Sequence, residues 1–335
     1  MKIALSAETY REPEAFKIER QAVWATEWIM FCTIAELSHP GEYFAGELAG
    51  FNILLVVDPE GSIVGFHNVC PHRAGVLAWP GQGTLGNLVC KYHGWAFGWD
   101  GHLKSARDFG NDEPLCAEHS ELKKIRVETW GPLVFVHLGE PAESLIDSLG
   151  GLIAKTESFP IETFSYARRM TRELACNWKT YVDNYLEGYH VQLLHPSLNR
   201  ALKMSSYKVS VHDDSYCVHE CEPSDGSPVA GAWLFRYPNL AINLYPSGMN
   251  VERIMPVGHH RTHVVYDYFA FDTSEDNIAQ MVAMSNEILD EDQNICEIVQ
   301  RNLDGGIYQA GPLSPRHEVC LEWFQRKVRD ASKNI

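Results

Sequence analysis

The sequence predicts an α+β protein in which a smaller all-β region precedes a larger region of helices and antiparallel strands. Three observations predict this class. Short β-like runs separated by turn residues fill the region from about 38 to 140, apolar and polar residues alternate repeatedly between 207 and 272, and Thr273–Leu303 is a long helical segment. A chain of 335 residues is also long enough to form two domains.

Composition and charge exclude several classes of function. The apolar share of 45% and the charged share of 21% are ordinary for a soluble protein, and no run approaches the roughly 18 apolar residues of a membrane span. The formal net charge of −16 argues against nucleic-acid binding. The first residues lack the apolar core of a signal peptide, so we expect a cytoplasmic protein. The nine cysteines are odd in number and scattered, which favours metal ligands over a disulfide framework.

The first elements are predicted from apolar periodicity. Residues 14–37 are expected to form a helix that begins just after Pro13. The apolar stripe of this helix consists of Phe16, Val23, Trp24, Trp28 and Phe31. The runs FNILLVVD and SIVGFHNVC are expected to pair as a hairpin around the turn at 59–61.

The later elements follow from alternation and turn signals. The run LKKIRVETWGPLVFVHL at 122–138 predicts two strands around Gly131-Pro132. After them we expect a polar helix and linker at about 140–160, a strand at 163–175, antiparallel strands within 207–222, 231–246 and 250–272, the helix Thr273–Leu303, and a last helix over about 314–330.

Two short cysteine and histidine motifs predict a metal centre. Cys70-Pro-His72 and Cys90-Lys-Tyr-His93 each follow a β-like run and each offer one thiolate and one imidazole. Two such loops can hold one metal centre between them. A Cys2His2 donor set suits either structural zinc or a [2Fe–2S] cluster in which one iron takes both sulfurs and the other both nitrogens.

A second constellation lies in the segment Asn177–His195. If the segment is helical, Asp183, Glu187 and His190 share one face, because their spacing is i, i+4, i+7. His195 lies about 140° further round an ideal helix, so the two histidines can reach one ion only if the helix loosens between them. The proline that follows His195 is a helix terminator. This pattern suits a 2-His-1-carboxylate iron site, and the alternative is a buried polar helix with hydrogen-bonded histidines.

The two constellations together resemble a known family. The pair CPHRAG and CKYHGW is similar to the cluster-binding loops of Rieske proteins, and NWK…DNYLEGYH…LHP resembles the iron segment of the Rieske non-haem iron ring-hydroxylating oxygenases, catalytic α subunit. The likeness covers nearly the whole chain. It implies an N-terminal helix over 1–37, a Rieske [2Fe-2S] domain over 38–140, and a mononuclear iron catalytic domain of the helix-grip (START-like) type over 141–335, with a curved antiparallel sheet.

The resemblance also implies the ligands. The Rieske cluster would be held by Cys70, His72, Cys90 and His93, and the mononuclear Fe(II) by His190, His195 and Asp292. The segment EDQNICEIVQRNL resembles the family stretch that carries the carboxylate, with Asp292 at the matching position. Helical spacing places Asp292 on an apolar face, but Glu291 has a similar claim, so periodicity alone does not separate the two carboxylates.

Glu187 departs from the commonest family pattern, which has Asp three residues before the first iron histidine. In the family this carboxylate bridges the two centres, so the resemblance implies contacts from Glu187 to His190 and to His93 of a neighbouring subunit. Asp183 and Asn184 complete the catalytic candidates of this segment. Such a bridge requires a ring of subunits, and we expect a homotrimer.

The implied activity is that of a terminal oxygenase component. Electrons from a separate NAD(P)H-dependent reductase, with or without a ferredoxin, would reach the cluster and then the iron, and O2 would be used to hydroxylate or demethylate a small organic substrate. No Gly-rich loop is identified as a dinucleotide-binding site, so the reductase is expected to be another chain. Glu187 is a weak indication of an N-methylated or quaternary amine substrate. The alternatives are an aromatic ring cis-dihydroxylating dioxygenase, a Rieske-type electron carrier, and a zinc-bearing structural or binding protein.

The substrate cavity can be outlined only roughly. Candidates for an apolar pocket wall are Val191, Leu194, Leu198, Leu202 and Met204, and candidates for its far wall are Phe235, Leu240, Asn243 and Tyr245. Trp130, Trp233 and Trp323 suit either core packing or an aromatic cage. His259, His260 and His263 are interpreted as surface strand histidines.

Overall fold

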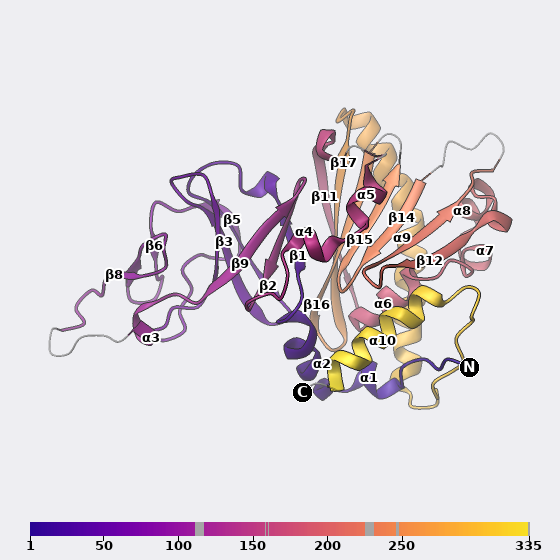
Figure 1. Ribbon diagram of the computed structural model, residues 1–335, viewed down its shortest axis with the longest axis horizontal. Coiled ribbons are helices and arrows are strands. Elements are labelled where there is room, and N and C mark those ends of the chain that lie inside the picture. The colour runs from indigo at the N-terminus through magenta and orange to yellow at the C-terminus, as the bar shows by residue number, and fades with distance from the viewer. Residues whose placement is uncertain (111–116, 158, 160, 225–230, 246–247, 334–335) are drawn as a thin grey trace. The chain divides into compact units, whose positions relative to one another are not determined.

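The computed structural model describes residues 1–110, 117–157, 159, 161–224, 231–245 and 248–333 (Figure 1). Two compact units are present. One consists of Ala25–Leu145, and the other joins Met1–Trp24 to Ile146–Ile335. The expected α+β class is confirmed. Within the described residues, no helix combines the length and the apolar character that a membrane crossing requires.

The smaller unit is built from β-strands. Its seven-stranded sheet has the order β1-β10-β9-β4-β3-β2-β5, and a three-stranded sheet has the order β6-β7-β8. The elements are β1 (Ile29–Thr33), η2 (Ile34–Glu36), β2 (Glu42–Leu48), β3 (Phe51–Val57), β4 (Ile63–His67), β5 (Gly81–Thr84), β6 (Leu88–Val89), β7 (Ala96–Phe97), β8 (Leu103–Ser105), α3 (Ala117–Ser120), β9 (Lys124–Trp130) and β10 (Leu133–His137). The expected hairpin of β3 with β4, and that of β9 with β10, are confirmed by their antiparallel registers.

The expected helix over residues 14–37 is wrong in its second half. Helix α2 spans Pro13–Glu19, a π-helical turn η1 covers Arg20–Trp24, and β1 then begins at Ile29. All five residues of β1 are buried, and the strand pairs with β10. A short, wholly apolar run has no period of its own, so the ladder to a distant strand decides its conformation.

The larger unit contains a seven-stranded antiparallel sheet in the order β11-β17-β16-β15-β14-β13-β12. Its strands are β11 (Ser165–Leu174), β12 (Lys208–His212), β13 (Tyr216–Cys221), β14 (Gly231–Arg236), β15 (Leu240–Tyr245), β16 (Gly248–Gly258) and β17 (Arg261–Ala270). Each of the three expected alternating regions therefore forms two strands, which confirms the meander; position 246 lies outside the described residues.

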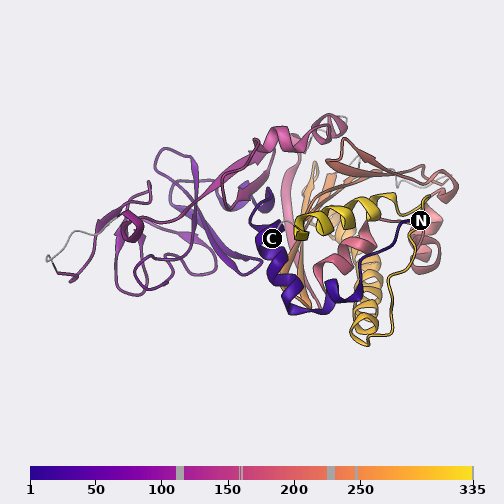
Figure 2. The same cartoon turned by 60° about the horizontal axis from the view of Figure 1, so that its bottom comes forward.

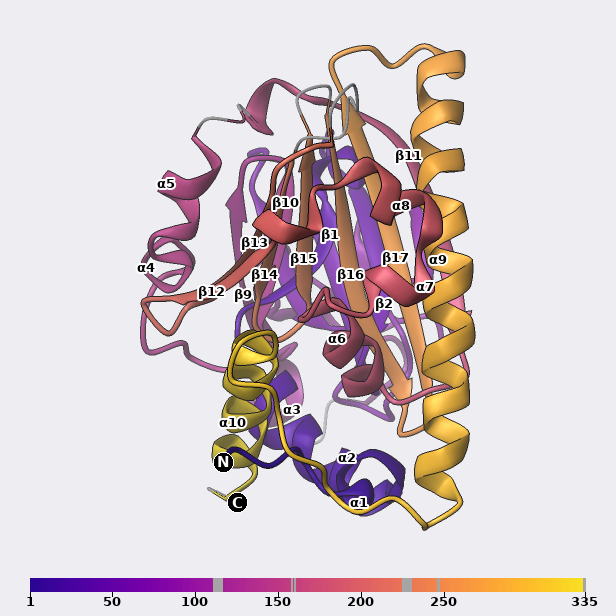
Figure 3. The same cartoon turned by 90° about the vertical axis from the view of Figure 1, so that its right-hand side faces the viewer.

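Helices cover this sheet. They are α1 (Ala7–Arg11), α2, α4 (Leu145–Leu149), α5 (Leu152–Thr156), η3 (Ile161–Thr163), α6 (Trp178–Tyr185), α7 (Val191–Leu194), α8 (Pro196–Ala201), η4 (Met204–Ser206), α9 (Glu275–Asp304) and α10 (Val319–Lys333). Figure 3 shows α6, α7, α8 and the long α9 on one face of the sheet, with α6 packing against both β16 and α9. Figure 2 shows α10 beside the first helices of the chain, and α10 contacts α2 and η1.

The expected helix over Asn177–His195 is interrupted, which is how its two histidines come together. Helix α6 begins at its cap, Asn177, and ends at Tyr185. Glu187 Oε2 then accepts hydrogen bonds from the backbone N–H groups of Tyr189 (2.9 Å) and His190 (3.3 Å), which starts the separate turn α7. The break therefore lies between Asp183 and Glu187, and the face that these residues were expected to share does not form.

Glycine at 188 permits this break. A Cβ atom built on Gly188 would lie only 2.1 Å from Tyr207 Oη, so no larger residue fits beneath that ring. The close approach of Tyr207 is a tertiary contact from a segment that follows α8. The loop is thus fixed by packing between distant parts of the sequence.

Candidate metal centres

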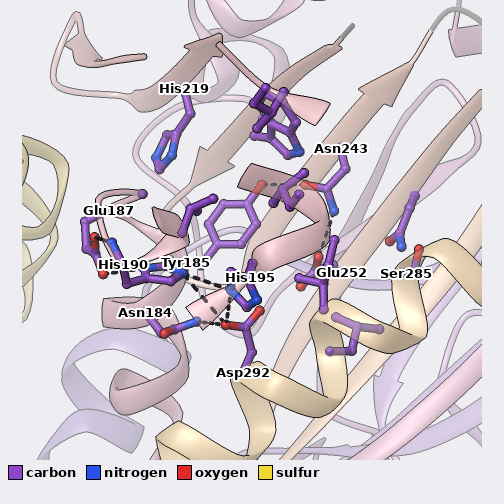
Figure 4. Close-up of a pocket in the computed structure, with 18 of the residues that line it drawn as sticks. Asn184, Tyr185, Glu187, His190, His195, His219, Asn243, Glu252, Ser285 and Asp292 are labelled. Atoms are coloured by element: carbon purple, nitrogen blue, oxygen red, sulfur yellow. Dashed lines mark hydrogen bonds and ion pairs between the residues drawn. The ribbon is translucent and has the colours of Figure 1, made fainter. Parts of the chain in front are cut away.

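Three donor atoms converge between the break after α6 and the middle of α9. His195 Nε2 lies 3.0 Å from Asp292 Oδ1, and His190 Nε2 lies 3.8 Å from the same oxygen. The two imidazole Nε2 atoms are 3.2 Å apart. Figure 4 shows these three side chains directed toward one point, and they form a group with metal-ligand spacing.

The hydrogen bonds behind the histidines fix their tautomers. His190 Nδ1 lies 2.5 Å from Glu187 Oε1, and His195 Nδ1 lies 2.7 Å from Glu291 Oε2. Because a carboxylate only accepts hydrogen bonds, each Nδ1 carries a proton, and Nε2 is the nitrogen of each ring that a metal can bind. When both rings are neutral, their Nε2 lone pairs and the carboxylate oxygen face one another and repel unless a cation lies among them. The donor set therefore fits a divalent metal, and its chemistry suits Fe(II) with open positions.

The structure distinguishes the roles of the two neighbouring carboxylates on α9. Asp292 Oδ1 faces both Nε2 atoms, whereas Glu291 contacts the far side of the His195 ring. Asn184 donates from Nδ2 to Asp292 Oδ1 at 2.7 Å and so orients this carboxylate. Asp292 is the carboxylate in position to complete the donor set, and Glu291 is in position to orient a histidine.

Asp183 points away from the donor set. Its Oδ2 accepts hydrogen bonds from Tyr10 Oη (2.5 Å) and Gln325 Nε2 (3.1 Å), so it contacts the N-terminal segment and α10. Burial raises the pKa of the Asp183 carboxyl to about 7, against the effect of these hydrogen bonds. Because α6 ends two residues later, Asp183 does not follow Glu187 toward the histidines.

A cavity of about 140 Å³ adjoins the three donors. It is lined by Tyr181, Asn184, Tyr185, Glu187, Gly188, His190, Val191, His195, Leu198, Leu202, Tyr207, His219, Trp233, Asn243, Tyr245, Asn250, Glu252, Ser285, Ile288, Leu289 and Asp292. The expected lining residues Val191, Leu198, Leu202, Asn243 and Tyr245 are among them. Of the other expected residues, Leu194 lines a different cavity, Met204 lies in η4, and Phe235 and Leu240 are buried in the sheet.

Sequence reasoning missed the polar floor of this cavity. Glu252 on β16 accepts hydrogen bonds from Tyr181 Oη at Oε2 and from Asn243 Nδ2 at Oε1, each at 2.7 Å. Tyr185 Oη in turn donates to Asn243 Oδ1 at 2.9 Å. Burial raises the pKa of the Glu252 carboxyl to about 7, although both hydrogen bonds act in the opposite direction. The signal in the sequence is the polar pair at alternate positions 250 and 252 in a strand whose other residues, except Arg253, are apolar or glycine.

The smaller unit holds the second candidate centre. Two loops carry the four candidate ligands, Cys70 and His72 on the first and Cys90 and His93 on the second. The backbone N–H of Cys70 donates to the carbonyl of Gly75 (2.7 Å), and that of Cys90 donates to the carbonyl of Trp95 (2.8 Å). The Nδ1 atoms of His72 and His93 are buried without a hydrogen-bond partner, and both thiols are buried. The ring centroids of the two histidines are 4.8 Å apart.

These four side chains fit a shared cluster. Two orphaned ring nitrogens and two thiols form the donor set of a [2Fe–2S] cluster with mixed ligation. Desolvation raises the pKa of the Cys70 thiol to about 11, so a metal is needed to hold this sulfur as a thiolate. A Cβ atom at position 75 would lie 3.0 Å from Cys90 Sγ and 2.8 Å from Tyr92 Cβ, which explains the glycine there.

Comparisons with known proteins agree with both centres. The family model for the ring hydroxylating alpha subunit (catalytic domain) matches residues 161–233 and 218–333, and that for the Rieske [2Fe-2S] domain matches residues 27–124. The carnitine monooxygenase oxygenase subunit of Escherichia coli (strain K12) is 31% identical over 321 residues, which cover 91% of this chain and 86% of the relative. The chloroplastic choline monooxygenase of Arabidopsis thaliana is 30% identical over 325 residues, which cover 90% of this chain and 76% of the relative.

Solved structures show the same architecture. The quaternary ammonium Rieske monooxygenase CntA in complex with L-carnitine aligns with a TM-score of 0.85 and 26% identity, covering 99% of this chain and 95% of that one. Naphthalene 1,2-dioxygenase with indole bound aligns with a TM-score of 0.79 and 18% identity, covering 99% of this chain and 95% of that one. At this identity the likeness is one of fold alone.

Proposed function

The chain belongs to the Rieske ring-hydroxylating oxygenases, and we propose that within this family it is a monooxygenase component that oxidises a small N-methylated or quaternary ammonium compound. As a family member it is an oxidoreductase that uses O2 on a small molecule and has a Rieske [2Fe-2S] cluster and a mononuclear iron. The observation that carries the proposal is the cavity beside the iron donors, where a buried carboxylate and aromatic rings meet.

We assign the two groups to the donor sets described above. Cys70, His72, Cys90 and His93 would hold the cluster, and His190, His195 and Asp292 would hold the iron, within domains proposed to span 38–140 and 141–335. When bound, the cluster supplies electrons and the iron supplies the activation of O2. The contribution of the protein side chains is to position the metal ligands and the substrate.

The residues around the iron donors have distinct positioning roles. Glu187 and Glu291 hold the two histidines with Nε2 free for a metal, because each carboxylate binds the opposite ring nitrogen. Asn184 holds Asp292 Oδ1 through its amide. Apolar side chains of α7, α8 and α9 line the cavity beside them.

Electron supply is proposed to come from outside the chain. The G-x-G-x-x-G match at 81–86 begins with strand β5 and does not open a helix, and the relative from Escherichia coli is described as an oxygenase subunit, which supports a separate NAD(P)H-dependent reductase. A solved structure of a quaternary ammonium Rieske monooxygenase is described in terms of inter-subunit electron transfer. By analogy we propose a homotrimer in which Glu187, already bonded to His190, also meets His93 of a neighbouring subunit.

The substrate class is proposed from the relatives and the cavity together. The relatives named above act on choline and carnitine, which both carry a trimethylammonium group. Aromatic ring cis-dihydroxylation has less support, because an uncharged aromatic substrate would leave the buried Glu252 without compensation.

Oxygen uptake with labelled O2 tests this proposal. Purified protein with a surrogate reductase is expected to consume O2 only when an N-methylated amine is added, and one oxygen atom from 18O2 should appear in the organic products. His190→Ala should abolish uptake and leave the cluster absorbance unchanged. Uptake supported only by aromatic acids, with two labelled atoms in the product, would favour the dioxygenase alternative. Zinc in place of iron would contradict both the proposed monooxygenase and the dioxygenase alternative.

A further inference from the structure

The cavity beside the iron donors is lined by three carboxylates and by three histidines, His190, His195 and His219. Glu187, Glu252 and Asp292 line it, and neither lysine nor arginine occurs among its described lining residues. Glu187 and Asp292 already face the histidines. Glu252 is therefore the carboxylate whose charge the iron site does not use.

Glu252 is held in place by neutral groups. The residue is 4% exposed, and its two oxygens accept hydrogen bonds from the Tyr181 hydroxyl and the Asn243 amide. No ion pair to Glu252 is found in the described part of the chain. The next residue on the strand, Arg253, points to the opposite face, where it forms a 2.9 Å ion pair with Asp267.

A buried carboxylate without a counter-ion is costly, so an occupant of the cavity with positive charge would be stabilised there. A quaternary ammonium group has no N–H and needs no acceptor. It would therefore leave the hydrogen bonds of Tyr181 and Asn243 to Glu252 undisturbed and would interact through charge alone. Figure 4 shows Glu252 and Tyr185 on the wall of the pocket that His195 and Asp292 also line.

Aromatic rings complete the surroundings of such a cation. Trp233 on β14 and Tyr245 on β15 both line the cavity and lie edge to face with centroids 6.5 Å apart. Tyr185 and Tyr207 line it from other elements. Aromatic faces attract quaternary ammonium groups.

Two buried side-chain atoms in this wall have no hydrogen-bond partner among the described residues, His219 Nε2 and the acceptor Asn250 Oδ1. Asn250 is 4% exposed, and its Oδ1 is buried without a hydrogen-bond partner. It lies on the same strand as Glu252, two residues away, and so on the same face. A ligand that donates a hydrogen bond, such as an alcohol, would satisfy it, whereas a carboxylate would not.

These observations rest on the proposed function and make it more specific. We propose that the cavity selects quaternary ammonium alcohols that carry no carboxylate, with Glu252 as the counter-ion of the ammonium group and Asn250 as the acceptor for the hydroxyl. A zwitterionic substrate would bring a further negative charge into a cavity that already holds three carboxylates and has no lysine or arginine among its described lining residues.

Binding to the wild-type holoenzyme provides the first test. Choline, its neutral carbon isostere 3,3-dimethylbutan-1-ol, and L-carnitine are titrated calorimetrically. Choline should bind at least about tenfold more tightly than either of the others, because it alone brings a positive charge beside Glu252 without adding a carboxylate. Equal affinity for choline and its isostere, or tighter binding of L-carnitine, would overturn the inference.

The variant Glu252→Gln keeps the shape of the side chain and removes its charge. It should weaken choline binding by about tenfold or more and leave the isostere unaffected. The matched control Glu173→Gln removes a charge from an exposed strand residue and should change neither the affinity for choline nor that for the isostere. Iron content and cluster absorbance verify that each variant is intact. If Glu252→Gln fails to fold, the wild-type comparison decides alone.

The outcomes separate the two proposals. Oxidation of L-carnitine in preference to choline would refute the selection by charge and leave the proposed monooxygenase standing. If no N-methylated compound binds or supports oxygen uptake, the proposed function fails, and the inference fails with it. Unchanged choline affinity in an intact Glu252→Gln variant would refute the role of this carboxylate.

Discussion

Removing Glu291 and Asp292 one at a time should have different consequences, although the two carboxylates are adjacent on α9. Asp292→Asn should abolish binding of the mononuclear iron, because Asp292 Oδ1 faces both histidine Nε2 atoms. Glu291→Ala should weaken iron binding without abolishing it. The Glu291 side chain contacts the opposite nitrogen, His195 Nδ1, at 2.7 Å.

The size of the second effect follows from burial. The His195 side chain is 1% exposed, but that of Glu291 is 29% exposed, so water can replace part of the lost hydrogen bond. A hydrogen bond to a charged group is worth about 1.5–3 kcal/mol, and partial replacement by water brings the loss to about 1.5 kcal/mol. This corresponds to an iron affinity about tenfold lower, which lies within the range typical for partners of metal-bound histidines.

The assay is competition between the protein and an Fe(II) chelator, with cluster absorbance as an internal control. The cluster should be the same in wild type, Asp292→Asn and Glu291→Ala. The matched control is Glu287→Gln, also on α9, whose carboxylate accepts from Ser197 instead of a histidine. If Glu291→Ala loses the iron completely while Asp292→Asn keeps it, the assignment of the third ligand is reversed.

Three further predictions concern the other groups of the two sites. Choline affinity should rise as the pH passes through about 7 and level off above it, because burial raises the pKa of the Glu252 carboxyl to about 7 and this group must ionise to attract the cation. Calorimetry over about three pH units centred near 7 should show this rise, and a flat profile would count against it. The phenols around it, Tyr181 and Tyr266, have pKa values raised well above 10 by burial and stay neutral over this range. Glu187→Ala should slow electron transfer with both metals retained, and unchanged single-turnover kinetics would argue against the bridge. Cys90→Ser should remove the cluster absorbance and leave the mononuclear iron in place, as measured by iron content and absorbance together.

The sequence reveals those features that depend on local spacing. The two loops of the cluster site are visible because each pairs a cysteine with a histidine within four residues. Local spacing does not reveal the roles of the adjacent carboxylates Glu291 and Asp292. Both lie next to apolar positions, so helical periodicity cannot decide between them, and only the position of His195 in space assigns each a role.

Features set by packing between distant segments could not be predicted. The break after α6 depends on Tyr207 lying against Gly188, and no pattern within Asn177–His195 contains that contact. The ladder to β10 likewise turns the apolar run after Trp28 into a strand. Glu252 appears in the sequence as one of three polar residues in a mainly apolar strand, and its surroundings become a cavity only through the helices α6 to α9 on that face of the sheet.

The charge around the iron donors connects the metal site to the choice of substrate. A bound Fe(II) would bring two positive charges, and three acidic side chains surround its site, because Glu187 and Glu291 accept hydrogen bonds from the histidines and Asp292 is a candidate ligand. The loaded centre therefore keeps a negative excess, to which an ionised Glu252 adds. A cationic substrate reduces this excess, whereas an anionic group increases it in surroundings of low dielectric constant. The sign of the substrate's charge, more than its size, is then the property on which this cavity discriminates.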